Sequence, residues 1–236
     1  MCTDCGCAVT ESRHLHLAHD LLSHNDERAA ANRRQFETAG VRVVNLLSSP
    51  GSGKTALLER LAREAAPEAA VAAIVGDLAT DNDARRLRQA GLTAIQLTTG
   101  RACHLEAAMV HRGVHELEHA GIRLADLDLL VVENVGNLVC PAAYDLGESL
   151  RLVMLSVTEG EDKPLKYPST FHSADLVVIS KIDLAAAVGF DHGAARAAIA
   201  AVAPRAAILE VSARSGEGIA ALMERLLPLA AVRGRG

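Results

Sequence analysis

The distribution of apolar residues divides the chain into a polar N-terminal region and a longer region in which short apolar runs alternate with helix-like segments. Apolar runs recur from Val41 onward. Before that point, leucines and alanines spaced among many charges predict an exposed amphipathic helix over residues 12–36 that lies against the main domain. We therefore expect an N-terminal tail and helix over residues 1–38 and one larger domain over residues 39–236.

Seven short apolar runs in the second region predict buried strands. They cover residues 42–47, 72–75, 94–97, 128–133, 150–157, 176–180 and 207–211. Several are continuous rather than alternating, as in Leu129-Leu130-Val131-Val132, which is typical of strands covered on both faces. Because turn residues or helical stretches follow each run, the pattern predicts an α/β fold with a mainly parallel sheet of about seven strands flanked by helices.

The first of these runs leads directly into a phosphate-binding sequence. The sequence is Ser48-Ser49-Pro50-Gly51-Ser52-Gly53-Lys54-Thr55, and from Ala56 a helical stretch continues to about Ala66. Glycines let backbone N–H groups surround phosphate oxygens, and the start of the helix adds partial positive charge. Lys54 is expected to reach the β- and γ-phosphates, and the Thr55 hydroxyl to bind Mg²⁺. Ser48 replaces the usual first glycine, but the remaining motif predicts a P-loop for residues 48–55 with nucleotide contacts from Pro50 to Ala56.

A second motif, Ser180-Lys181-Ile182-Asp183, ends a predicted strand, where open α/β sheets bind ligands. It resembles the Asn-Lys-x-Asp sequence of GTPases, with Ser180 in place of Asn. Asp183 would accept hydrogen bonds from the guanine N1–H and amine, which adenine cannot supply, and the Lys181 stem would pack on the ring. Ser212-Ala213-Arg214 resembles the second base-contacting loop of GTPases. Each motif alone is common at polar strand ends, but in this order behind a phosphate loop they favour guanine.

Two carboxylates follow predicted strands and are candidate Mg²⁺ or water-positioning groups. Glu133-Asn134-Val135-Gly136 has the position of the GTPase Asp-x-x-Gly motif, so Glu133 would hold Mg²⁺ through water and the Gly136 amide would sense the γ-phosphate. Asp77 is the second candidate, and its alternative role is an N-cap for a helix over residues 80–90. The candidate catalytic residues are Lys54, Thr55, Asp77 and Glu133.

The five cysteines suggest metal ligation or thiol chemistry, because their number is odd and an apolar export signal is absent. Three thiols within six residues could wrap one soft ion such as zinc, copper(I) or nickel, and the alternative is an unliganded terminus. These are Cys2, Cys5 and Cys7. Two later segments on the nucleotide side could converge on one ion, although buried free cysteines are the more usual interpretation. They contribute Cys103, His104 and Cys140. We interpret the histidines at 14, 16, 19 and 24 as solvated.

Composition excludes several partners. The net charge of −5 and sequence pI of about 6.1 leave no positive excess for a phosphate backbone, and tryptophan is absent, so nucleic acid is not expected. No apolar run approaches the roughly 18 residues of a membrane span. We therefore expect no membrane association and a cytoplasmic location.

Three segments together resemble the hydrogenase nickel-incorporation GTPases, the HypB family, over essentially the whole chain. They are Cys2-Thr3-Asp4-Cys5-Gly6-Cys7, the phosphate loop, and Ser156-Val157-Thr158-Glu159-Gly160-Glu161-Asp162-Lys163-Pro164-Leu165-Lys166-Tyr167-Pro168. The resemblance implies a P-loop GTPase fold of the SIMIBI type over residues 39–236. It also implies slow hydrolysis of GTP to GDP and phosphate, a GTP-dependent homodimer, and delivery of nickel to the hydrogenase large subunit precursor with a HypA-type accessory protein.

The same resemblance supplies the metal and the dimer contacts. Nickel, or zinc at the same sites, would bind an N-terminal site and a site in the GTPase domain. The first would be Cys2, Cys5 and Cys7, and the second Cys103, His104 and Cys140. Lys163 or Lys166 would approach the phosphates across the dimer, with residues 184–188 on the dimer face. Two alternatives stay open: a small-molecule kinase that uses ATP, and a nickel buffer whose GTPase domain only drives dimerisation.

Overall fold

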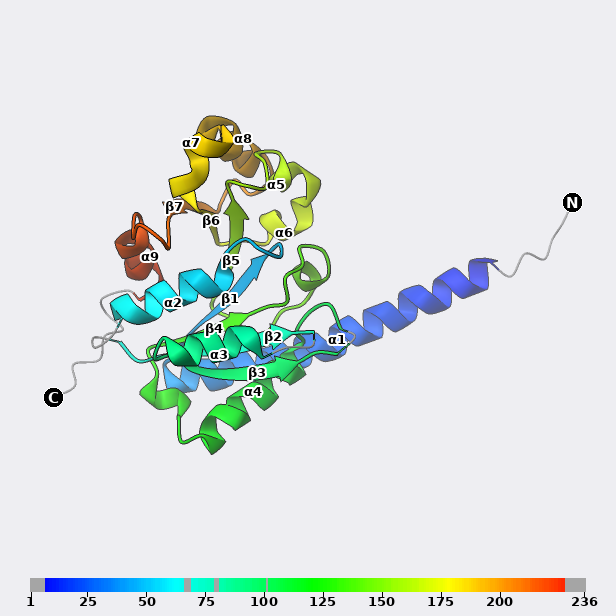
Figure 1. The fold of residues 1–236 in the computed structure, drawn as a ribbon. Coiled ribbons are helices and arrows are strands. Elements are labelled where there is room, and N and C mark those ends of the chain that lie inside the picture. Colours follow the sequence, from blue (N-terminus) through cyan, green and yellow to red (C-terminus); the bar gives the residue numbers. More distant parts are fainter. Residues whose placement is uncertain (1–6, 66–68, 79–80, 101, 228–236) are drawn as a thin grey trace, which may run out of the picture.

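The sheet predicted from the apolar runs is present in the computed structural model, which describes residues 7–65, 69–78, 81–100 and 102–227. Seven parallel strands form one sheet in the order β3-β2-β4-β1-β5-β6-β7 (Figure 1). The strands are β1 (Arg42–Ser48), β2 (Val71–Asp77), β3 (Thr93–Thr98), β4 (Leu129–Glu133), β5 (Leu150–Ser156), β6 (Leu176–Ser180) and β7 (Ala207–Val211). Their ends lie within two residues of the predicted ones, so the predicted fold class is confirmed.

Helices cover both faces of the sheet. One face packs against α2 (Lys54–Ala65), α3 (Asn82–Gln89) and α9 (Ile219–Leu226). The other packs against α1 (Cys7–Ala39), α4 (Ala107–His119), α6 (Pro168–His172) and α8 (His192–Val202). Shorter helical turns lie between them: η1 (Leu124–Asp126), η2 (Cys140–Ala143), α5 (Lys163–Lys166), η3 (Ile182–Leu184) and α7 (Ala185–Val188).

The central strand β1 shows why the strands read as continuous apolar runs. Val44 and Leu46 belong to the core beneath α2, whereas Val43 and Leu47 belong to the opposite cores. All four side chains are buried, because successive residues of a strand point to opposite faces and helices cover both.

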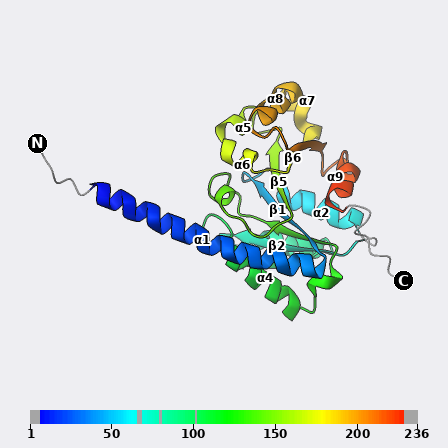
Figure 2. The ribbon, with the colours of Figure 1, turned by 180° about the vertical axis from the view of Figure 1, so that it is seen from behind.

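Helix α1 is longer than the predicted helix, and its C-terminal half lies along α4, whereas its N-terminal part extends past the sheet (Figure 2). Phe36 is buried in the core together with Val41 and Val43. Asn32 is also buried, and its side-chain amide donates to the Ala107 carbonyl at 2.9 Å and to the Leu146 carbonyl at 3.0 Å. The packing of this helix against the main domain is therefore confirmed for the part whose side chains are described, residues 22–39.

The parallel arrangement determines where ligands can bind. The carboxyl ends of all seven strands meet at one edge of the sheet, so the loops that follow them converge there. Within the described ranges, none of the helices combines the length and the apolar character that a bilayer span requires.

Candidate functional site

The phosphate loop joins β1 to α2 and is held together by short polar contacts. Gly51 and Gly53 have φ angles of +75° and +99°, a left-handed backbone that glycine adopts without strain. Ser48 is fully buried, and its hydroxyl accepts hydrogen bonds from Lys54 Nζ at 2.9 Å and from the Ser52 hydroxyl at 2.5 Å. The serine that replaces the usual glycine therefore holds the lysine beside the loop.

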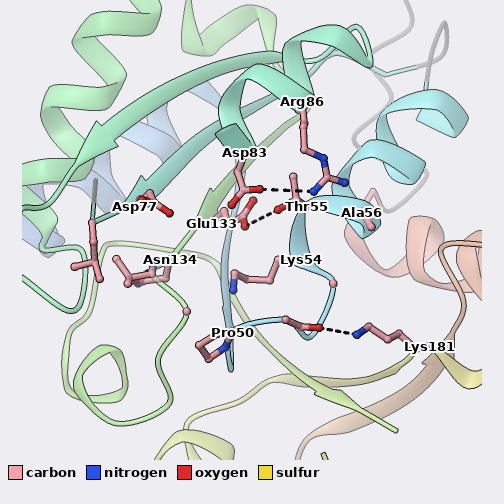
Figure 3. Close-up of a pocket in the computed structure, with 16 residues that line it drawn as sticks. Pro50, Lys54, Thr55, Ala56, Asp77, Asp83, Arg86, Glu133, Asn134 and Lys181 are labelled. Atoms are coloured by element: carbon pink, nitrogen blue, oxygen red, sulfur yellow. Dashed lines mark hydrogen bonds and ion pairs between the residues drawn. The ribbon is translucent and has the colours of Figure 1, made fainter. Parts of the chain in front are cut away.

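The loop borders a cavity of about 530 Å³ at the carboxyl edge of the sheet (Figure 3). Its lining contains most of the residues predicted for the phosphate end of a nucleotide: Pro50, Gly51, Gly53, Lys54, Thr55, Ala56, Asp77, Glu133, Gly136 and Lys181. Asn134, Asp83 and Arg86 also line it. Backbone amides, a helix start and an ammonium group thus surround one concave space, as phosphate binding requires.

Lys54 and Glu133 are both buried beside this cavity, and burial opposes both charges. Desolvation lowers the pKa of Lys54, while it raises the pKa of Glu133 to about 7 against the opposing effect of Lys54. The Thr55 hydroxyl donates to Glu133 Oε1 at 3.2 Å. Glu133 Oε2 has no hydrogen-bond partner among the described residues. A buried carboxylate oxygen without a partner, next to a threonine hydroxyl, is the oxygen donor set that Mg²⁺ prefers.

Glu133→Gln is expected to stabilise the nucleotide-free protein at pH 8, because it removes a carboxylate whose ionisation the fold opposes. With a folded pKa raised to about 7, the contribution of Glu133 to stability is fully present below its ordinary pKa and is lost as the pH rises to about 7. The loss is on the order of 3 kcal/mol. Urea unfolding at pH 4 and pH 8 measures it. In the control Glu116→Gln, which changes an exposed residue, the free energy of unfolding should depend on pH as in the native protein. If it also does so in Glu133→Gln, the ionisation of Glu133 does not destabilise the fold.

Asp77 lies at the cavity, and a different aspartate occupies the N-cap position of the following helix. Asp77 ends β2 and lines the cavity, whereas α3 begins at Asn82 with Asp81 at its N-cap position, so Asp77 is not the cap of this helix. Sequence reasoning missed Asp83 and Arg86, which reach the cavity from α3 with Nη1 of Arg86 3.8 Å from Asp83 Oδ1. Their spacing of three residues on a predicted helix was the available signal.

A second hollow of about 230 Å³ continues from the first and shares Gly53, Ala56 and Lys181 with it. It is lined by the residues predicted for the base together with apolar neighbours: Ser52, Gly53, Ala56, Leu57, Met154, Ser180, Lys181, Asp183, Leu184, Val211, Ala213 and Arg214. Ser212 is buried beneath it, and its hydroxyl donates to Asp183 Oδ1 at 2.6 Å. This contact holds one carboxylate oxygen and leaves the other for a ligand.

Ser180, which replaces the usual Asn, connects β6 to the phosphate loop. Its hydroxyl donates to the Ser52 carbonyl at 2.9 Å, and Lys181 Nζ donates to the Gly51 carbonyl at 2.6 Å. Lys181 has a φ of +61°, an uncommon conformation for a residue with a side chain. The loop after β6 and the phosphate loop, which border the two hollows, are therefore in direct contact.

The two later segments with thiols do converge, and we call Cys103, His104 and Cys140 the cysteine–histidine cluster. Their ligand atoms lie within 4.8 Å of one another. The segments that carry them follow β3 and β4, and the Asn137 side-chain amide joins these segments by donating to the Cys103 carbonyl at 3.3 Å. The three groups can therefore serve as ligands of one soft or borderline metal ion.

Surrounding side chains orient the imidazole of this cluster. His104 stacks on Tyr144 with ring centroids 3.9 Å apart, and its Nε2 lies 3.6 Å from Glu106 Oε1. Its Nδ1 faces the Cys103 sulfur at 3.8 Å. No hydrogen bond joins His104 Nε2 to Glu106 at this distance, but a carboxylate near one ring nitrogen with a ligand position at the other is the type of arrangement that supports metal-binding histidines. Burial lowers the pKa of His104, which favours the neutral form that binds metals.

The other cysteines predicted to bind metal, and four histidines, belong to the N-terminal region. Cys2 and Cys5 are outside the described residues, and Cys7 is described only as the first residue of α1. The side chains of the histidines at 14, 16 and 19 are also outside the described part, whereas His24 is exposed. The N-terminal metal site therefore stays a prediction.

Comparisons with known proteins agree with this geometry. The nucleotide-binding domain of the CobW/HypB/UreG family matches residues 42–210. A hydrogenase maturation factor HypB from Azotobacter vinelandii is 50% identical over 213 residues, which make up 89% of this chain and 68% of that protein.

Solved structures of other proteins are similar to this chain in fold. HypB from Helicobacter pylori, crystallised in complex with nickel, is similar with a TM-score of 0.82 and 42% identity, covering 86% of this chain and 94% of that one. The signal recognition particle 54 kDa protein from Aeropyrum pernix in complex with GDP has a TM-score of 0.54 at 17% identity, covering 81% of this chain and 47% of that one, which shows a shared fold. The chain is thus a P-loop GTP hydrolase that belongs to the HypB family of hydrogenase maturation factors.

Proposed function

We propose that this chain binds nickel and delivers it to the hydrogenase large subunit precursor, and that GTP binding and hydrolysis switch its nickel affinity. Two relatives support the proposal: the Azotobacter vinelandii protein is named a hydrogenase maturation factor, and the Helicobacter pylori structure is a complex with nickel. The nickel ion is cargo in this account. The protein must therefore hold it and release it in different nucleotide states.

One structural observation carries the switch: the segment of residues 134–140 contacts both sites. Near its start, Gly136 lies against the phosphate loop, so close that a Cβ added to this glycine would be 3.2 Å from Cα of Pro50. The Asn134 side-chain oxygen accepts a hydrogen bond from the Leu105 amide at 3.0 Å, next to the cysteine–histidine cluster. At its end, the segment supplies Cys140 itself. A shift at the γ-phosphate would therefore move a metal ligand.

The hydrolytic site would act by positioning and charge stabilisation. Lys54 and the loop amides would neutralise charge on the phosphates, and water would attack the γ-phosphate. Thr55, Glu133 and Asp77 would hold Mg²⁺ directly or through water, and the ion would supply further neutralisation of the β- and γ-phosphate oxygens. Asp77 or Glu133 would orient the water.

Guanine recognition would use the second hollow. The free oxygen of Asp183 would accept from the base N–H groups, while Lys181 would pack on the ring. Ser212 and Ala213 would border it, with Ser212 acting through the carboxylate that it holds. An adenine nucleotide offers no matching donors, which opposes the alternative of an ATP-dependent kinase.

We further propose a GTP-dependent homodimer and a HypA-type accessory protein as partners. Among the described residues, Val139, Leu165 and Val188 are large apolar side chains that stay exposed, by 65%, 53% and 50%. Val139 precedes the ligand Cys140, and Val188 ends the predicted dimer segment of residues 184–188. Apolar surface beside the metal site and beside the base site is what partner docking at these places would cover.

Cys140→Ser is expected to lower nickel affinity of the cysteine–histidine cluster at least about 100-fold, since even groups behind the ligands contribute about 10–100-fold. GTP hydrolysis should stay near the native rate, because Cys140 does not line the nucleotide cavity. Cells that carry this variant in place of the native protein should contain little active nickel hydrogenase.

The control is Tyr144→Phe, which keeps the ring that stacks on His104 and should preserve maturation. Normal maturation by Cys140→Ser would favour the alternative of a nickel buffer, in which only the N-terminal cysteines matter. Loss of maturation together with loss of GTP hydrolysis would indicate a folding defect, and the result would then no longer support a role of Cys140 in nickel delivery.

A further inference from the structure

Helix α4 carries a group of histidines outside the nucleotide site and the cysteine–histidine cluster. His111, His115 and His119 are spaced four residues apart, so they lie along one side of the helix. The Nε2 atoms of His111 and His115 are 3.2 Å apart, with ring centroids separated by 4.5 Å and planes inclined by 80°. The two side chains therefore present their outer nitrogens to the same point.

This separation matches the spacing of two ligands on one metal ion. Nitrogen ligands bind zinc and similar ions at about 2.0–2.1 Å, which places two of them about 2.9 Å apart at a right angle and about 3.4 Å apart at the tetrahedral angle. In the metal-free protein, the same 3.2 Å suits an N–H···N hydrogen bond between neutral rings. The pair is therefore held near its chelating arrangement before an ion arrives.

An acidic residue supports this arrangement from behind. Glu118 Oε2 lies 3.4 Å from Nδ1 of His115, on the ring nitrogen that faces away from His111. A carboxylate at this distance attracts a proton on Nδ1 and so favours the tautomer whose Nε2 lone pair is free for a metal. The positive charge of Arg28 on α1 disfavours a charged His111 ring, and Glu118 partly offsets that charge.

The surroundings favour a labile site rather than a storage site. The His115 side chain is 54% exposed, and His111 is half-buried. Two protein ligands leave the other coordination positions to water, so a bound ion can exchange. Imidazole nitrogen suits nickel, copper and zinc, whereas magnesium and calcium prefer oxygen.

We propose that His111 and His115 form a bidentate binding site for Ni²⁺ on α4, separate from the cysteine–histidine cluster, with Glu118 as its positioning residue. The site lies one and two turns into the helix that begins at Ala107, directly after the segment of Cys103 and His104. It does not depend on the proposed delivery function. A nickel ion here would be open to solvent, because the His115 side chain is 54% exposed.

Equilibrium dialysis of the full, reduced, nucleotide-free chain against Ni²⁺ tests the site. His111→Gln and His115→Gln are each expected to bind one equivalent less than the native protein. The double variant should lose no more than either single variant, because one ligand alone cannot hold the ion. Glu118→Gln should keep the equivalent and weaken its affinity about tenfold.

His119→Gln is the matched control, an exposed histidine one turn further along the same helix, and should bind as much nickel as the native protein. Unchanged stoichiometry in both His111→Gln and His115→Gln would overturn the proposal. A loss in His119→Gln equal to theirs would also overturn it, since it would indicate unspecific binding to surface histidines.

Discussion

Lys54→Ala is expected to lower the rate of GTP hydrolysis by at least about 100-fold while leaving the protein folded. The rate falls because removal of one preorganised donor to a developing oxyanion costs about 10²–10³-fold, and Lys54 is the ammonium group beside the loop amides in the phosphate cavity. Single-turnover hydrolysis with saturating GTP measures the chemical step separately from binding.

The stability of Lys54→Ala should not fall together with its activity. Burial lowers the pKa of Lys54, so the fold opposes its charge, and its Nζ donates a hydrogen bond to the Ser48 hydroxyl at 2.9 Å. The melting temperature of nucleotide-free Lys54→Ala should therefore not fall. Arg63→Ala, exposed on the same helix, should keep the native rate. Hydrolysis by Lys54→Ala within about tenfold of the native rate would show that the lysine is not the phosphate ligand.

Asp183→Asn is expected to exchange the preferred base from guanine to xanthine. Ser212 donates to Oδ1 of Asp183, and an asparagine can keep that bond with its oxygen. Its amide NH₂ would then occupy the place of the free carboxylate oxygen, where it opposes the guanine amine but can donate to the xanthine O2. GTP affinity should fall at least about 100-fold, since a site built around hydrogen bonds strongly rejects a mismatched partner.

Competition between GTP, xanthosine triphosphate and ATP for a fluorescent nucleotide measures this exchange. Glu217→Gln, exposed in the neighbouring loop, should retain the native order of affinities. If Asp183→Asn binds GTP as tightly as the native protein does, the second hollow is not the base site.

The sheet could be predicted because its signal is local. Continuous apolar runs such as residues 129–132 require burial on both faces, and this requirement specifies strands between covering helices without any knowledge of the partners. The parallel order then places every following loop at one edge. The convergence of Cys103 and Cys140 could be anticipated for the same reason, since each follows a strand.

The contacts that unite the site could not be predicted, because they join residues distant in sequence. Ser180 bonds to the Ser52 carbonyl across 128 positions, and nothing in the local sequence distinguishes this role from contact with a base. Asn134 reaches the Leu105 amide in the same way. Asp83 and Arg86 depend on where α3 begins, and helix starts are set by the surrounding fold as much as by local residues.

We propose that the nucleotide state changes the nickel affinity of the cysteine–histidine cluster. A calorimetric nickel titration of the reduced, full chain tests it, once with Mg²⁺ and GDP and once with Mg²⁺ and a non-hydrolysable GTP analogue. The nickel affinities in the two states should differ by at least about fivefold, and this difference should disappear in Cys140→Ser. Identical isotherms in the two nucleotide states would contradict it, because an ion held equally in both states cannot be released by hydrolysis.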